Sequence, residues 1–178
     1  MNQIPKITLD TNCVINLFDP TSPSRESVED LEAIIKAGND GRADICITTR
    51  AEFDVEHDKD SERMKTMLRH IASLPKIGTV GRWDVTKWDI GDFWADENSL
   101  LLEERVRNAL FPNFAETNPR YRNELADIDH VVGHICAHRD IFVTSDKHIL
   151  KRSSPLTTSD NLSVMKPSKC RLFLERQN

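Results

Sequence analysis

Three short apolar runs, each followed at once by polar residues, constrain most strongly what this chain can fold into. They are KITLD at residues 6–10, DICIT at 44–48 and IFV at 141–143. Each has the length and composition of a buried strand, and segments with helical spacing of apolar residues separate them. Strands that alternate with helices form βαβ units. We therefore predict a three-layer α/β/α fold around a mostly parallel central sheet.

The expected helices follow from apolar residues that recur at helical spacing. The first begins near Ser22-Pro23, a capping hydroxyl followed by proline, and Gly38 closes it. Three more helices are predicted at residues 50–73, 97–110 and 125–138. The tail at 169–174 is predicted to be a short strand or a helix.

Apart from the helix predicted at 97–110, residues 75–123 show little pattern that indicates their structure. They hold Trp83, Trp88 and Trp94. We predict a helical insertion here, within one domain that spans residues 1–178. The tryptophans are expected to form a small satellite core. The alternative is a platform on which nucleobases stack.

Charge and cysteine content narrow the functional classes. A net charge of −5 and a pI of about 5.7 argue against a protein that binds nucleic acid through a broad basic surface. They leave open an enzyme whose excess carboxylates are neutralised by metal. The four cysteines are scattered and form no CxxC, so we expect reduced core residues in a cytoplasmic protein. Neither a membrane span nor a secretion signal is expected.

Acidic and hydroxyl side chains stand where the apolar runs stop. In an open parallel sheet, functional groups collect beyond the carboxyl ends of the strands. The groups there are Asp10-Thr11-Asn12, Thr48-Thr49-Arg50-Ala51-Glu52 and Thr144-Ser145-Asp146, and Asp127 with Asp129 lies on a helix that must pack on the sheet. Carboxylates held close together repel unless a cation lies between them. Hard oxygen ligands favour Mg²⁺ or Mn²⁺.

The ordered combination of these motifs resembles the PIN-domain family. The matching stretches are ITLDTNCVINLFD at the start, TTRAEF in the middle and DIDHVVGHICAHRDIFVTSDKHIL near the end. The resemblance implies that Asp10, Glu52, Asp127 and Asp146 bind metal, and that Asn12 and Thr144 support them through hydrogen bonds. It also implies an RNA substrate. Many small bacterial members are toxins neutralised by an antitoxin, so an antitoxin partner and a homodimer are further expectations.

Two assignments stay open at this point. Asp127 and Asp129 differ by about 200° around a helix, since each residue turns it by ~100°, and they cannot both face one site. We favour Asp127, because it borders the apolar face of the helix more closely. Glu52 has a rival in Glu56, one turn later.

Basic residues near the predicted site are candidates for substrate binding. They are Arg50, Lys147, Lys151 and Arg152, and they would guide a phosphate backbone towards the metals. His130, His134 and His138 recur every four residues, a spacing that could bind zinc. Because no cysteine pair accompanies them, we predict a solvent-exposed stripe instead.

The chemistry implied is hydrolysis of a phosphodiester by metal-activated water. One alternative is a non-catalytic domain of the same fold that binds RNA or protein. Another is a phosphatase with Asp10 as nucleophile, but such enzymes usually carry an aspartate two residues later, where this chain has Asn12.

Overall fold

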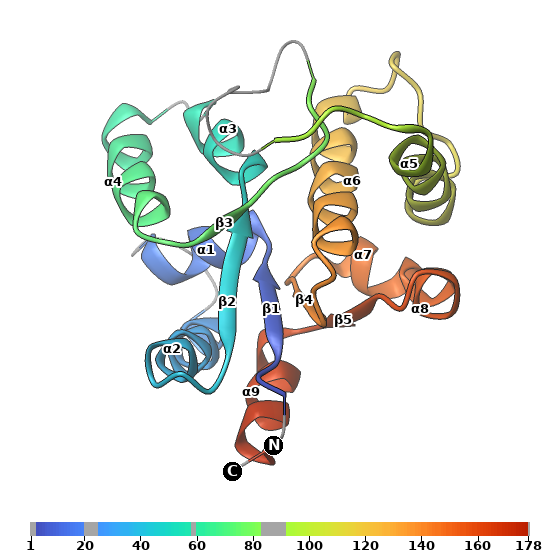
Figure 1. Ribbon diagram of the computed structural model, residues 1–178. Helices are drawn as coiled ribbons and strands as arrows, with labels where there is room; N and C mark the ends of the chain where they lie inside the picture. Colours follow the sequence, from blue (N-terminus) through green and yellow to red (C-terminus); the bar gives the residue numbers. More distant parts are fainter. Residues whose placement is uncertain (1–2, 20–24, 58–59, 83–91, 178) are drawn as a thin grey trace.

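A five-stranded, all-parallel sheet forms the centre of the molecule (Figure 1). The computed structural model describes residues 3–19, 25–57, 60–82 and 92–177. The strands are β1 (Lys6–Leu9), β2 (Asp44–Thr48), β3 (Lys76–Ile77), β4 (Ile141–Val143) and β5 (Ser163–Met165), in the order β3-β2-β1-β4-β5. The predicted parallel α/β architecture is confirmed, and all three predicted strands are present.

Helices connect successive strands and cover both faces of the sheet. They are α1 (Thr11–Phe18), α2 (Arg25–Asn39), α3 (Arg50–Glu56), α4 (Ser61–Ala72), α5 (Glu97–Leu110), α6 (Tyr121–Cys136), α7 (Lys147–Arg152), α8 (Ser154–Ser159) and α9 (Pro167–Glu175). The tail, predicted as strand or helix, is therefore helical. Among the described residues, no helix combines the length and the apolar character that crossing a bilayer requires.

The two faces of the sheet are buried against different helices, because side chains alternate along each strand. Ile7, Leu9, Ile47 and Val143 pack with α1, α2, α4 and α9, whereas Phe142 packs with α5, α6, α7 and α8. Figure 1 shows α1, α2 and α4 on one side of the strands and α5 to α8 on the other. The carboxyl ends of β1, β2 and β4 lie together along one edge of the sheet, the carboxyl edge, next to α3 and α6.

The helix predicted over 50–73 is two helices. The first ends at Glu56, and the second begins at Ser61, where the Asp60 side chain accepts hydrogen bonds from two backbone N–H groups. Apolar spacing alone did not separate them. The predicted start at Ser22-Pro23 lies outside the described residues, and α2 continues one residue past Gly38.

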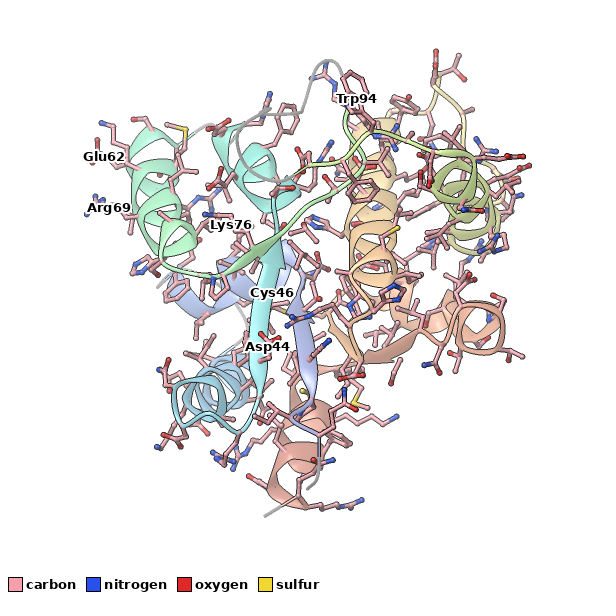
Figure 2. The ribbon with its side chains drawn as sticks, viewed as in Figure 1. Asp44, Cys46, Glu62, Arg69, Lys76 and Trp94 are labelled. Atoms are coloured by element: carbon pink, nitrogen blue, oxygen red, sulfur yellow. The ribbon has the colours of Figure 1, made fainter. Side chains whose placement is uncertain are left out.

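The predicted insertion also contributes to the main fold. It supplies the edge strand β3, and helix α5, whose Leu102, Val106 and Leu110 are buried against α6. The satellite core predicted for the tryptophans is wrong for Trp94, which is 66% exposed at the surface (Figure 2). Trp83 and Trp88 lie outside the described residues.

The cysteines behave as the sequence predicted. All four are free thiols, and Cys13, Cys46 and Cys170 are buried. Burial raises the pKa of each of these three thiols, so they pack as small apolar groups.

Candidate active site

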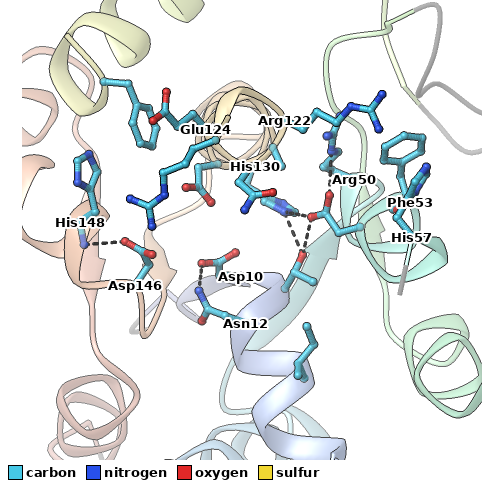
Figure 3. Close-up of a pocket in the computed structure, with 18 residues that line it drawn as sticks. Asp10, Asn12, Arg50, Phe53, His57, Arg122, Glu124, His130, Asp146 and His148 are labelled. Carbon is cyan, nitrogen blue, oxygen red and sulfur yellow. Dashed lines mark hydrogen bonds and ion pairs between the residues drawn. The ribbon is translucent and has the colours of Figure 1, made fainter. Parts of the chain in front are cut away.

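A pocket of about 460 Å³ lies at the carboxyl edge of the sheet and collects acids from four elements. Asp10 follows β1, Asp146 follows the neighbouring β4, Asp54 lies on α3 and Asp127 on α6. Figure 3 shows Asp10 and Asp146 facing the same space. Side chains separated by more than a hundred residues thus meet because β1 and β4 are adjacent and parallel.

Asp10 is held in place by the two side chains that the sequence placed beside it. It is 2% exposed, and its Oδ2 accepts hydrogen bonds from Asn12 Nδ2 and Thr144 Oγ1. Asn12 Oδ1 in turn accepts from the backbone N–H of Ser145 at 3.0 Å. Burial raises the pKa of Asp10, although His130 and Thr144 oppose the shift. Asn12 therefore ties together the ends of β1 and β4.

Asp146 is fixed by the helix that follows it. Its Oδ1 accepts from the backbone N–H groups of His148 and Ile149 at 2.6 and 2.9 Å, as an N-terminal cap of α7. Its own N–H donates to Thr144 Oγ1 at 2.9 Å. The cap sets the direction of the carboxylate, which lines the pocket.

Asp127 lines the pocket, and among the described residues no positively charged side chain forms an ion pair with it. Burial, with the neighbouring charges of Asp10, Asp146 and Asp54, raises its pKa to about 8, and His130 opposes this only in part. Asp129 does not line the pocket. It is 2% exposed and binds Arg50 Nη1 at 3.1 Å and Arg82 Nη2 at 2.6 Å. Of the two candidates, Asp127 is thus the one that lines the pocket.

Glu52 lies elsewhere than its predicted role requires. Its carboxylate pairs with Lys76 Nζ at 3.0 Å, on the β3 side of the sheet, and does not line the pocket. Asp54 lines the pocket instead. It lies two positions after Glu52 on α3, and a step of two residues turns the side chain to a different side of the helix. Glu56 is exposed at the end of α3 and does not line the pocket either. Asp54 carried no distinctive sequence signal, since two of its partners, Thr11 and His130, come from distant segments.

Both carboxylate oxygens of Asp54 accept hydrogen bonds from other side chains of the protein. Its Oδ1 accepts from Arg50 Nε at 3.1 Å, and its Oδ2 lies 2.9 Å from His130 Nε2 and 3.2 Å from Thr11 Oγ1. Burial alone would raise the pKa of Asp54, but His130 and Arg50 lower it overall. This carboxylate is therefore ionised and oriented by the chain itself.

The predicted stripe of solvent-exposed histidines is wrong for two of its three members. His130 and His134 are 2% and 1% exposed, and only His138, beyond the end of α6, is exposed. His134 Nδ1 bonds Thr8 Oγ1 at 2.9 Å, and burial lowers its pKa to about 3. Burial alone would lower the pKa of His130 as well, but Asp54 raises it overall.

Of the four predicted substrate-binding residues, one lines the pocket. Arg50 lines it, but it is buried and paired with Asp54 and Asp129. Lys147, Lys151 and Arg152 lie on α7 and do not line the pocket. Two arginines that the sequence did not single out do so, Arg120 and Arg122, and both are exposed at the start of α6.

The pocket fits a hard divalent cation in charge and in ligand type. Asp10, Asp127 and Asp146 offer only carboxylate oxygens, which suits Mg²⁺ or Mn²⁺, and the raised pKa of Asp127 shows that its charge lacks compensation. In the described ranges, no three Asp, Glu, His or Cys side chains already surround a single point as a complete metal site. The carboxylates would have to close around an ion.

Comparison with known proteins supports the fold. No protein-family model matches the chain, and no curated protein matches it. A solved structure is similar: VapBC2 from Rickettsia felis bound to a DNA fragment from their promoter, with a TM-score of 0.50 and 13% identity, over 90% of this chain and 98% of that chain. The chain has a PIN-like fold. This PIN-like fold spans nearly all of the chain, so the predicted insertion does not prevent the match.

Proposed function

We propose that this protein is a metal-dependent endoribonuclease that hydrolyses phosphodiester bonds. The observation that carries the proposal is the half-buried and only partly compensated carboxylate of Asp127, beside Asp10 and Asp146 at the carboxyl edge of a parallel sheet. A buried acid with a strongly raised pKa in a pocket is typical of a functional site. The PIN-like fold supports the same reaction class by analogy.

In this proposal Asp10, Asp127 and Asp146 would hold Mg²⁺ or Mn²⁺. A divalent ion at such a site supplies a water of lowered pKa and neutralises charge on the phosphate. Asn12 and Thr144 hold Asp10 in position through their hydrogen bonds. Asp54 and His130 form the floor beside it, and the exposed guanidinium groups of Arg120 and Arg122 would bind the phosphate backbone.

The test is cleavage of a labelled RNA by the purified protein with Mg²⁺ or Mn²⁺, and with a chelator. We expect cleavage that the chelator stops and that Asp146→Asn reduces strongly. Asp40→Asn is the matched control, because Asp40 lies in an exposed surface ion pair, and it should cleave as well as the wild type. Cleavage that survives chelation, or an Asp146→Asn protein as active as the control, would rule out the proposal.

The same assay separates the alternatives. A non-catalytic RNA- or protein-binding module would give no metal-dependent cleavage by the wild type. A phosphatase with Asp10 as nucleophile would release phosphate from a monoester and form an aspartyl-phosphate. The amide of Asn12, which donates to Asp10 and Thr144, disfavours this phosphatase, because a second carboxylate would be expected there.

A toxin role with an antitoxin partner, in the cytoplasm, extends the proposal. Its support is that the similar solved structure is of VapBC2 bound to promoter DNA. Expression of the wild type alone should then arrest bacterial growth, and expression of Asp146→Asn should not. A homodimer is part of the same proposal, and its test is the mass of the purified protein in solution.

A further inference from the structure

We propose that the two ends of the pocket are base-stacking subsites, so that the site takes a single-stranded RNA whose bases lie on either side of the bound phosphate. This inference rests on the proposed function. Figure 3 shows the arrangement that motivates it: Asp10 lies near the middle of the pocket, Phe53 and His57 lie at one end, and His148 lies at the other, next to Asp146.

The first end is an aromatic pair formed by Phe53 on α3 and His57, which directly follows this helix. The ring centroids of Phe53 and His57 are 4.2 Å apart, at an interplanar angle of 41°. His57 Nδ1 lies 2.8 Å from the Phe53 carbonyl oxygen and must donate to it, since a carbonyl only accepts. The Arg50 guanidinium carbon lies 4.8 Å from the Phe53 ring centroid. Phe53 is thus supported from within the protein, and His57 is exposed.

The second end is a parallel pair formed by Phe111 and His148. Their ring centroids are 4.8 Å apart and their planes differ by 10°. His148 Nε2 donates to the Leu110 carbonyl oxygen at 2.7 Å, which fixes the imidazole over the phenyl ring. Phe111 itself is 8% exposed and belongs to the core, so His148 is the partly exposed member. Both ends therefore present an imidazole that is already immobilised.

Two cations at the mouth complete the binding surface. Arg120 and Arg122 line the pocket and are exposed. In the part of the chain that the structure describes, neither guanidinium has a carboxylate within ion-pair distance, whereas Arg50 and Arg82 are both committed to Asp129. Unpaired arginines beside an acidic pocket would hold the phosphates that flank the scissile one.

The aromatic pairs at the two ends of the pocket, together with the arginines that line it, favour binding of single-stranded RNA over duplex RNA. Each base has a face that can stack on a fixed ring, and such stacking tolerates any sequence. The bases of a duplex are stacked on one another and are unavailable to these rings. The pocket volume, about 460 Å³, lies within the roughly 300–1,000 Å³ range of small-ligand sites, so it suits a nucleotide unit.

A purely structural role for the aromatic pairs is the competing explanation, and the molecule offers a matched control. Phe18 and His70 stack with centroids 4.1 Å apart and planes 1° apart, between α1 and α4, and neither lines the pocket. If stacked histidines serve only packing, His57→Ala and His70→Ala should have the same effect. If His57 receives a base, only its removal should weaken RNA binding.

The experiment measures RNA affinity in an Asp127→Asn background, which prevents cleavage under the proposed function. Fluorescence anisotropy would compare a short unstructured oligoribonucleotide, its duplex, and the same strand built from abasic units. We expect the intact single strand to bind more tightly than either of the others. We expect His57→Ala to weaken its binding by about 5- to 100-fold, the range of one stacked base, and His148→Ala to act in the same direction.

For the abasic strand, His57→Ala and His70→Ala should bind alike, because the lost contact is to a base. Thermal melts of each variant ensure that the compared proteins are folded. Equal effects of His57→Ala and His70→Ala on the intact strand, or equal affinity for single strand and duplex, would overturn the inference. Metal-dependent cleavage by the wild type is scored separately, so failure of the proposed function is distinguishable from failure of the stacking subsites.

Discussion

Asp127 and Asp129 stand two positions apart on the same helix, and both are withdrawn from water, but their surroundings are opposite. Asp129 lies between the guanidinium groups of Arg50 and Arg82. Asp127 faces three other carboxylates across the pocket, and its pKa is raised to about 8. Removal from water, partial for Asp127 and nearly complete for Asp129, is therefore common to both acids. What distinguishes them is whether the chain supplies the compensating charge.

This contrast gives each region an expected response to mutation. A buried ion pair that loses one partner leaves an uncompensated charge behind, at a cost of several kcal/mol. A buried carboxylate without a partner is itself a cost to the fold, and its removal relieves repulsion among its neighbours. The Asp129 region should thus respond in stability, and the Asp127 region in activity.

The largest expected effect is on stability, from Asp129→Ala. It leaves Arg50 and Arg82 without their shared carboxylate, so we expect the free energy of unfolding to fall by about 3–5 kcal/mol. Urea denaturation of the wild type and the variant measures this. A loss below about 1 kcal/mol would mean that the Asp129 cluster does not hold α6 against α3 and the segment after β3.

The next effect is on catalysis, from Asp127→Asn. We expect cleavage to fall by about 100- to 1,000-fold, the range seen when one electrostatic group is removed from an active site. The melting temperature at pH 7 without metal should not fall, since the acid retains its proton there and the amide is a neutral group of nearly the same size. If the variant cleaves normally, Asp127 has only a structural role, as Asp129 does.

A pH dependence should separate the wild type from the same variant. The folded pKa of Asp127, about 8, exceeds the unfolded value of about 3.9, so the folded state retains a proton that the unfolded state loses. This contribution to stability is complete below pH ~4 and is lost as the pH rises towards 8. Between pH 5 and 8 in chelator, we expect the wild type to lose roughly 3–4 kcal/mol more than Asp127→Asn.

His134 provides an internal check on that measurement. Its folded pKa of about 3 lies below the unfolded value, so its contribution is present above pH ~6.5 and is lost as the pH falls towards 3. This slope has the opposite sign and occurs in both proteins, so it cancels in their difference. Identical pH profiles for the two proteins would contradict the raised pKa of Asp127.

The smallest expected effect is from Glu52→Gln. Glu52 pairs with Lys76 away from the pocket, and partly exposed pairs contribute about 1 kcal/mol or less. Cleavage should stay within about twofold of the wild type, well short of the loss expected for a pocket acid. If Glu52→Gln abolishes cleavage while Asp54→Asn does not, the second acid of the site is the one that the sequence first indicated.

The sequence predicted the parts of the site that depend on one strand and its neighbour. Asp10 and Asp146 each follow an apolar run directly, and the parallel order brings both runs to the same edge. The convergence of these two acids needed only local patterns and the rule that strand ends meet. The supporting roles of Asn12 and Thr144 were implied by the resemblance to the PIN-domain family, and their hydrogen bonds to Asp10 are present.

Features that depend on contacts between distant elements were missed. Asp54 acquires its place from Thr11 and His130, and His130 is buried because Thr48 and Asp54 satisfy its ring nitrogens. Spacing along α6 predicted an exposed face, because it does not reveal such partners. The edge strand β3 is two residues long, too short for a pattern to indicate.

The most direct test of the account is a calorimetric titration of the metal-free protein with Mn²⁺. The account predicts saturable binding by the wild type and by Asp40→Asn, and at least a tenfold loss of affinity in Asp10→Asn. It also predicts proton release at pH 7, since the ion displaces the proton that Asp127 retains. A wild type with no saturable binding, or an Asp10→Asn protein that binds as tightly, would contradict the claim that these carboxylates await a cation.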